Sequence, residues 1–199
     1  PADLGYYDLR VPETRQAQAD MAREYGVEAF CYWHYWFGNG RRLLERPFNE
    51  VLESGKPDFP FCLAWANHSW RGIYNGVKTK ESLIDQTYGG LSDYERHFYD
   101  VLPAFEDKRY VTVDGKPFFL IFAPAEIPDS REFIDCWQRL AARNGLTGIH
   151  FVAHTYQPND IDNFLSMGYD AVNVVRLFEY QRIGISFVQK VLNKVNREV

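Results

Sequence analysis

The chain of 199 residues has no long apolar run, no signal-like start and no block of like charge. A membrane-crossing helix needs about 20 apolar residues in succession, and the first residues do not combine a basic segment with an apolar one. The 22 basic and 27 acidic residues are scattered and give a net charge of −5. We therefore expect a globular domain with no transmembrane segment and no nucleic-acid partner.

Cysteine is also scarce. Cys31, Cys62 and Cys136 form no C-x-x-C pair, and they lie in apolar runs or on an expected helix. This usage is typical of buried thiols in a reducing compartment, which predicts a cytoplasmic protein.

Residues 1–199 are expected to form a single domain. The chain begins as if in the middle of a domain, and the helix expected at residues 186–199 has no glycine or proline to end it. This pattern predicts that the domain is truncated at both ends.

Apolar spacing and turn residues predict an alternation of helices and strands. The expected helices are residues 12–25, 41–53, 91–105, 129–143 and 160–167. The five main strands are residues 27–37, 59–66, 117–123, 149–155 and 171–175, and a hairpin at Asp114-Gly115 joins a short strand at 110–113 to the third of them. Continuous apolar strands separated by helices indicate a parallel sheet, either a barrel or a doubly wound sheet.

Two features favour the barrel. No glycine-rich turn follows any strand, which disfavours the nucleotide-binding open sheet. Aromatic and polar residues instead gather after the strands, where barrel enzymes build their sites. A complete barrel needs eight strands and about 250 residues. We therefore predict an α/β fold of the (β/α)8 TIM-barrel type, present here as a partial barrel of about five parallel strands with outer helices.

The most informative segment is the aromatic run AFCYWHYWF at residues 29–37. The next strand also ends in aromatic and polar residues, WANHSW at residues 65–70. Hydroxyl, indole and imidazole groups need partners when they are buried. Two such strands predict a pocket that stacks on and hydrogen-bonds to a flat ligand rich in hydroxyls, and a sugar fits best. A large aromatic core is the alternative, because strands favour aromatic residues.

Several ordered motifs resemble the glycoside hydrolase family 99-like domains, many of which are classed as WbsX-type glycosyltransferases of bacterial surface-polysaccharide clusters. They are LGYYDLR at residues 4–10, FCYWHYWF at 30–37, LLERP at 43–47, SGKPDFPFCLAWAN at 54–67 and DGKP at 114–117. The resemblance spans most of residues 4–125 and is weaker from residue 149 onward. It implies an eight-unit barrel, a carbohydrate substrate and no obligatory metal or nucleotide cofactor.

The chain departs from the family pattern at two places. Family members usually carry Glu after the Trp-Ala-Asn of the third strand, where this chain has His68. The family's acidic Asn-Glu-Trp-type segment, where catalytic carboxylates are expected, would lie beyond Val199.

Nine residues near strand ends are candidates for sugar binding: Tyr32, His34, Trp36, Trp65, Asn67, His68, Trp70, His154 and Tyr156. Trp36, Trp65 and Trp70 are expected as stacking platforms, with Asn67 supplying directional hydrogen bonds beside Trp65. His34 is expected to serve a sugar hydroxyl or to orient a carboxylate, or else to be a core histidine. A metal site formed by His34, His68 and His154 is a rival hypothesis.

Glycoside hydrolysis ordinarily requires two carboxyl groups. Glu126 and Glu179 lie near strand ends, whereas Asp170 starts a strand and so faces the wrong edge. Glu126 is a candidate catalytic acid, with a solvated loop residue as the alternative. The sequence thus predicts a carbohydrate-active enzyme domain, either hydrolase or transferase, acting on a glycosidic bond of a polysaccharide or surface glycan. A non-catalytic carbohydrate-binding barrel is the second hypothesis, and the fragment alone is expected to be inactive.

Overall fold

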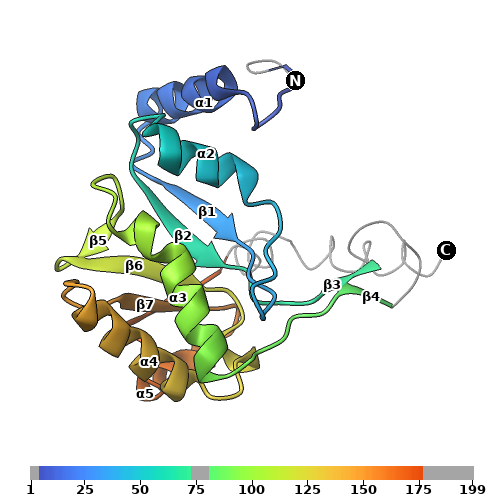
Figure 1. Ribbon diagram of the computed structural model, residues 1–199, viewed down its shortest axis with the longest axis vertical. Helices are drawn as coiled ribbons and strands as arrows, with labels where there is room; N and C mark the ends of the chain where they lie inside the picture. The colour runs from blue at the N-terminus through green and yellow to red at the C-terminus, as the bar shows by residue number, and fades with distance from the viewer. Residues whose placement is uncertain (1–4, 73–80, 177–199) are drawn as a thin grey trace, which may run out of the picture.

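The computed structural model describes residues 5–72 and 81–176, and the structural statements below concern these residues. The helix expected at residues 186–199 and Glu179 lie outside them. Five parallel strands make the main sheet (Figure 1): β1 (Phe30–His34), β2 (Phe61–Trp65), β6 (Lys116–Ile121), β7 (His150–Thr155) and β8 (Ala171–Val174).

The strands follow one another in the sheet in the order of the chain, β1-β2-β6-β7-β8. A doubly wound sheet would reverse this order in its middle, so the predicted sequential arrangement is confirmed. The expected hairpin is present too, since β5 (Thr112–Val113) pairs antiparallel with β6. Asp114 and Gly115 between them both have positive φ, the conformation of a tight hairpin turn.

The helices between the strands are α1 (Pro12–Glu24), α2 (Arg46–Ser54), α3 (Leu91–Phe105), α4 (Ser130–Arg143) and α5 (Ile161–Ser166). The prediction gave the bounds of α3 and located the other four. It was wrong at the start of α2, because residues 36 and 42 pair as an antiparallel bridge and the chain turns between them. The helix begins only where Pro47 occupies its first turn, a position that favours proline.

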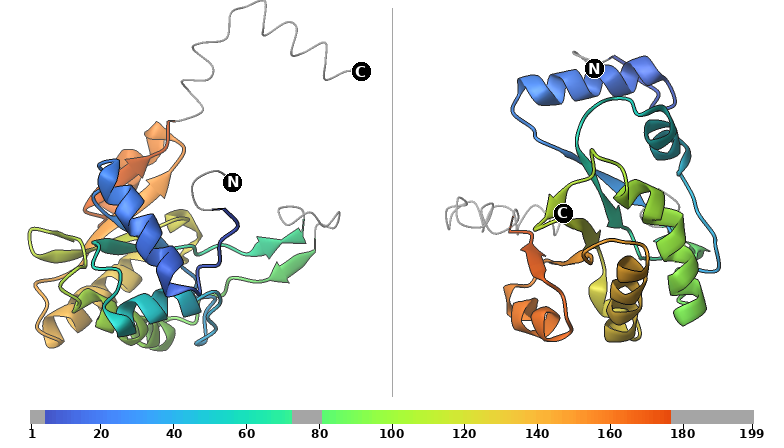
Figure 2. Two further views of the ribbon diagram at one scale, coloured as in Figure 1. Left: turned by 90° about the horizontal axis from the view of Figure 1, so that it is seen from above. Right: turned by 60° about the vertical axis from the view of Figure 1, so that its left-hand side comes forward.

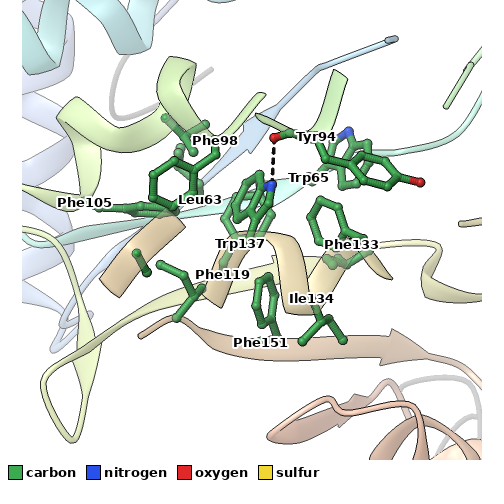
Figure 3. Close-up of a cluster of buried hydrophobic side chains, with 14 of the residues drawn as sticks. Leu63, Trp65, Tyr94, Phe98, Phe105, Phe119, Phe133, Ile134, Trp137 and Phe151 are labelled. Atoms are coloured by element: carbon green, nitrogen blue, oxygen red, sulfur yellow. Dashed lines mark hydrogen bonds between the residues drawn. The ribbon is translucent and has the colours of Figure 1, made fainter. Parts of the chain in front are cut away.

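One face of the sheet carries the helices. Phe61, Leu63 and Trp65 of β2 pack with residues of β6, β7, α3 and α4 into the largest buried cluster. Trp137 of α4 is at its centre, fully buried, with its indole Nε1–H donating to the Tyr94 carbonyl at 3.0 Å (Figure 3). The helices α3 and α4 lie side by side over this layer (Figure 2). This arrangement agrees with the prediction of helices on the outer face only.

The opposite face of the sheet has a different character. Its buried cluster draws on strand residues alone, with Ala64, Leu120 and Val152 at the centre and Phe118 and Ala171 beside them. At its β1 end Trp33 stays 51% exposed. We call this side of the sheet the open face, and in a closed barrel it would be the interior wall.

A small hairpin at the carboxyl ends of β1 and β2 was not predicted. It consists of β3 (Trp70–Arg71) and β4 (Ser82–Ile84) and projects from the body of the domain (Figure 2). None of the helices within residues 5–72 and 81–176 has the length and apolar content that crossing a bilayer requires.

Candidate functional site

A row of rings crosses the open face at the carboxyl ends of the strands. Phe122, which follows β6, lies 5.0 Å from the His68 ring and 5.0 Å from the His154 ring, measured between centroids. Trp33 meets Phe122 edge-on at 5.5 Å, and Tyr156 meets His154 edge-on at 5.1 Å. We call these five residues the aromatic floor. They come from or follow β1, β2, β6 and β7, so parallel pairing joins four distant segments into one surface.

A cleft of about 600 Å³ opens next to the floor. Its lining comes from the segment after β2, from β3 and from the turn after β6: His68, Ser69, Trp70, Arg71, Phe122, Ala123 and Glu126. Trp70 is held edge-on against Tyr35 at 5.3 Å and Phe37 at 5.5 Å, both of which follow β1. The loop after β1 therefore fixes one wall of the cleft.

Asn67 ties the ends of β2 and β6 together. Its Nδ2 donates to the Ala123 carbonyl at 2.8 Å, and its Oδ1 accepts from the Ala123 N–H at 2.7 Å. The Tyr88 hydroxyl joins the network by donating to the Asn67 carbonyl at 3.1 Å. Asn67 is fully buried, although its partner Ala123 is half-buried at the cleft, so water competes little for these bonds. They hold the segment that presents Phe122 and Glu126 to the cleft.

Two imidazoles flank Phe122, and each has a buried nitrogen without a partner among the described residues: Nδ1 of His68 and Nε2 of His154. Burial lowers the pKa of both rings; at His68 the Glu126 carboxylate acts in the opposite direction. Asn173 Nδ2 lies 3.1 Å from His154 Nδ1. An amide nitrogen can only donate, so Nδ1 accepts and Nε2 carries the ring proton. The floor thus carries two imidazole rings without a fixed charge, whose unpaired nitrogens are themselves buried.

Glu126 is the carboxylate in the cleft lining. It ends the short 3₁₀ turn η2 (Pro124–Glu126) and is exposed. Its environment provides neither the apolar pocket nor the second carboxylate that glycosidases use to tune an acid. Asp170 lies at the opposite edge of the sheet, where its carboxylate accepts the Phe151 N–H at 2.9 Å. It is therefore remote from the cleft, as its place before a strand predicted. The described part of the cleft therefore holds one carboxylate.

The structure corrects the expected roles of His34 and Trp36. Both side chains point into the helix-covered layer, where they are 5% and 4% exposed. The Nε2 atoms of His34 and His97 are 2.8 Å apart, and the Trp36 indole stacks on His97 at 4.8 Å and 4°. Trp36 Nε1–H also donates to Asp93 at 3.3 Å. His34 is thus a core histidine, the alternative left open above, and Trp36 offers no face to a ligand.

The structure also places three other candidates away from a ligand: Trp65, Tyr32 and Asn67. Trp65 is 1% exposed, and its Nε1–H donates to the Trp36 carbonyl at 2.9 Å. Tyr32 packs against Phe48 of α2 at 5.2 Å. The expectation that Trp65 and Asn67 jointly contact a sugar is therefore corrected: one is a core residue and the other a clamp. His68, Trp70, His154 and Tyr156 remain at or beside the cleft.

The rival metal site does not fit this arrangement. His34 lies on the helix-covered side, whereas His68 and His154 lie on the open face with Phe122 between them. Zinc requires ligand atoms about 2.1 Å from one point. Within the described ranges, no three His, Cys, Asp or Glu side chains are grouped closely enough to hold a metal ion.

Sequence reasoning missed Trp33 and Phe122. Successive side chains of a strand point to opposite faces, so Trp33 and Tyr35 had to lie opposite His34 and Trp36. That signal was present in the aromatic run. The run has no alternation of polar and apolar residues, so the sequence does not show whether the set with His34 or the set with Trp33 faces the helices.

The chain matches the family described as "Glycosyltransferase WbsX" over residues 1–198. The protein WxcX of Xanthomonas campestris pv. campestris (strain B100), described as uncharacterized, is 34% identical over 173 residues, and so is its counterpart in strain ATCC 33913. These matches cover 86% of this chain but 24% of each relative, so the chain spans about a quarter of their length.

Solved structures share the fold at low sequence identity. The GH99 endo-alpha-mannosidase from Bacteroides thetaiotaomicron superposes with a TM-score of 0.57 at 14% identity, over 84% of this chain and 44% of that one. A structure described as a glycoside hydrolase-like protein gives 0.57 at 14% identity, over 86% and 51%. The described strands therefore have the arrangement of part of such a TIM barrel.

Replacing Asn67 with Ala should loosen the cleft. The change removes the partners of the half-buried Ala123 N–H and carbonyl, and we expect the free energy of unfolding to fall by about 1–3 kcal/mol. Hydrogen exchange at residues 123–127 should quicken more than exchange in α4. Asn159→Ala, at an exposed position of η3 (Pro158–Asp160), is the control and should change little. Equal exchange in both variants would contradict the clamp.

The buried histidine pair should make stability depend on pH. Burial lowers the pKa of His34 to about 3 and that of His97 well below 6.5, and the Arg42 charge acts in the same direction. The unfolded chain then binds protons that the folded chain excludes. The contribution of the two rings to the free energy of unfolding is fully present above about pH 6.5. It falls as the pH drops toward 3, by up to about 1.4 kcal/mol per pH unit for each ring.

His97→Phe tests this pH dependence, because it keeps a ring against Trp36 and removes one titrating group. Urea unfolding at several pH values between about 4 and 5.5, where the unfolded ring is fully protonated, should give a slope smaller by about 1.4 kcal/mol per unit than in the parent. Tyr99→Phe, at a half-exposed position of the same helix, should keep the parent slope. Parallel curves for His97→Phe and the parent would rule out the histidine contribution.

Proposed function

Because this chain belongs to the WbsX glycosyltransferase family, we propose that its open face forms one wall of a carbohydrate site in a protein that makes or breaks a glycosidic bond. The observation that carries the proposal is the aromatic floor with its two neutral imidazoles. Sugar rings have apolar faces that stack on aromatic rings and hydroxyls that need directional donors and acceptors. Phe122 supplies the first, and the polar side chains that line the adjoining cleft, among them His68, Ser69 and Glu126, supply the second.

The location of the floor supports the same assignment. It lies at the carboxyl ends of parallel strands, the edge at which TIM barrels bind substrates. The cleft beside it has room for a ligand of a few hundred cubic ångströms, within the usual range of small-molecule sites. The polysaccharide or surface glycan remains our proposed substrate class. The cytoplasmic location and the absence of a nucleic-acid partner stay predictions.

A non-catalytic binding domain is the second candidate, and the single carboxylate of the described cleft favours it. Hydrolysis ordinarily needs two carboxyl groups flanking the bond. The full protein would supply the second group from outside the described residues if it is an enzyme. We therefore propose that the wall formed here binds and orients the sugar.

Phe122→Leu should weaken glycan binding. The change keeps an apolar side chain but removes the ring face, and we expect a loss of about 1.5 kcal/mol, or roughly tenfold in Kd. Binding is measured on an array of bacterial surface oligosaccharides and then in solution with the best binder. Tyr99→Leu on the far side of α3 is the matched control and should bind as the parent does. Unchanged affinity of Phe122→Leu for a glycan that the parent binds would refute the floor as a sugar site.

Glu126→Gln separates the two candidate functions of the described cleft. In the full-length protein we expect glycan release or transfer to change by less than about tenfold, because Glu126 is exposed and stands alone. A loss of several orders of magnitude would place a catalytic acid at residue 126. Glu132→Gln, at an exposed position in the first turn of α4, is the control for loss of one charge.

A further inference from the structure

Two cysteines lie side by side on the open face. Cys31 of β1 and Cys62 of β2 are register partners in the parallel pair, so their side chains emerge on the same side of the sheet. Neighbouring strands are about 4.7–4.9 Å apart, which falls inside the range of roughly 4.4–6.8 Å between the Cα atoms of disulfide-bonded cysteines. The expected burial of all three thiols is corrected here, because Cys31 is exposed while Cys62 and Cys136 are buried.

The two thiols also interact chemically. The neighbouring Cys62 thiol lowers the pKa of Cys31, while the same pairing and burial raise the pKa of Cys62. An accessible thiol with a lowered pKa next to a protonated second thiol is the arrangement of a redox-active pair. Cys136 is different, because it is buried on α4 and burial raises the pKa of its thiol.

We propose that Cys31 and Cys62 form a reversible oxidation site, with a hydroperoxide as the oxidant and a disulfide between β1 and β2 as the product. The Cys31 thiolate attacks the peroxide oxygen, hydroxide leaves and a sulfenic acid forms. The Cys62 sulfur then attacks the Cys31 sulfur and water leaves. In total, two thiols and one hydrogen peroxide give one disulfide and two waters, and a dithiol reductant reverses the change.

The site adjoins the aromatic floor but does not depend on the proposed carbohydrate function. Cys31 is two residues before Trp33 on the same face of β1, and Trp33 contacts Phe122. A cross-link there would fix the spacing of β1 and β2 beneath one end of the floor. Oxidation is therefore measured on the thiols themselves, and its success or failure is independent of any glycan assay.

Trypsin places each cysteine in a separate peptide: residues 24–41, 43–71 and 132–139. The second peptide stays whole at Arg46 and Lys56 because a proline follows each of them. The intact full-length protein is treated with hydrogen peroxide, blocked with a thiol reagent, digested and analysed by mass spectrometry. We expect the first two peptides to be joined, and dithiothreitol to release them. The same treatment in urea should give a mixture of pairings that includes residues 132–139.

Three variants sharpen the test. Cys136→Ser should form the cross-link as fast as the parent. Cys62→Ser should leave Cys31 as a sulfenic acid that dimedone traps, and Cys31→Ser should slow oxidation of Cys62 by about tenfold or more, because Cys62 is buried. Circular dichroism establishes that each variant is folded. A folded parent in which Cys31 is not oxidised, or is oxidised to sulfinic acid with Cys62 still free, would overturn the proposal.

Discussion

The alternation of side chains along the parallel strands is the constraint on which the rest of the molecule depends. It sends Tyr32, His34 and Trp36 toward the helices and leaves Cys31 and Trp33 on the open face. A shift of one residue would exchange the two sets. The sites discussed above lie on the open face, while the stabilising aromatic mass lies on the other. Position along a strand is therefore enough to separate residues that support the site from residues that could touch a ligand.

The helix-covered layer reaches the cleft through polar contacts. Asp93 at the start of α3 accepts the Asn39 N–H at 2.7 Å and the Trp36 indole N–H, so the loop after β1 is fastened to this helix. Gly38 in that loop has φ of +87° and lies against Thr87, where a side chain would collide with the backbone. The loop in turn positions Tyr35 and Phe37, against which Trp70 packs. The buried layer thus determines one wall of the cleft without contributing a residue to it.

Much of the fold could be predicted from the sequence, because helices and strands alternate with clear turn residues between them. The bounds of α3 follow from its apolar spacing, and the Asp114-Gly115 turn identifies its hairpin. The site was harder, since residues 30–37 are apolar or aromatic on both faces and carry no alternating polar pattern. The partner of His34 was beyond reach as well: His97 lies 63 residues away, on a helix whose orientation only the fold determines. Phe122 is one of several apolar residues in the strand expected at residues 117–123, and its exposure depends on that strand ending at Ile121.

If the full protein is an enzyme, its reaction class depends on the side chains that face this wall across the cleft. Hydrolysis would require a second carboxyl group about 5 to 9.5 Å from the first, with the water or nucleophile between them. Transfer would require groups that stabilise the leaving group of an activated sugar, and for a phosphate leaving group cationic side chains serve best. The wall described here contributes one exposed carboxylate, Glu126, and one arginine, Arg71, to the same cleft. An aromatic surface beside polar side chains is compatible with either reaction, because the fold does not determine the reaction.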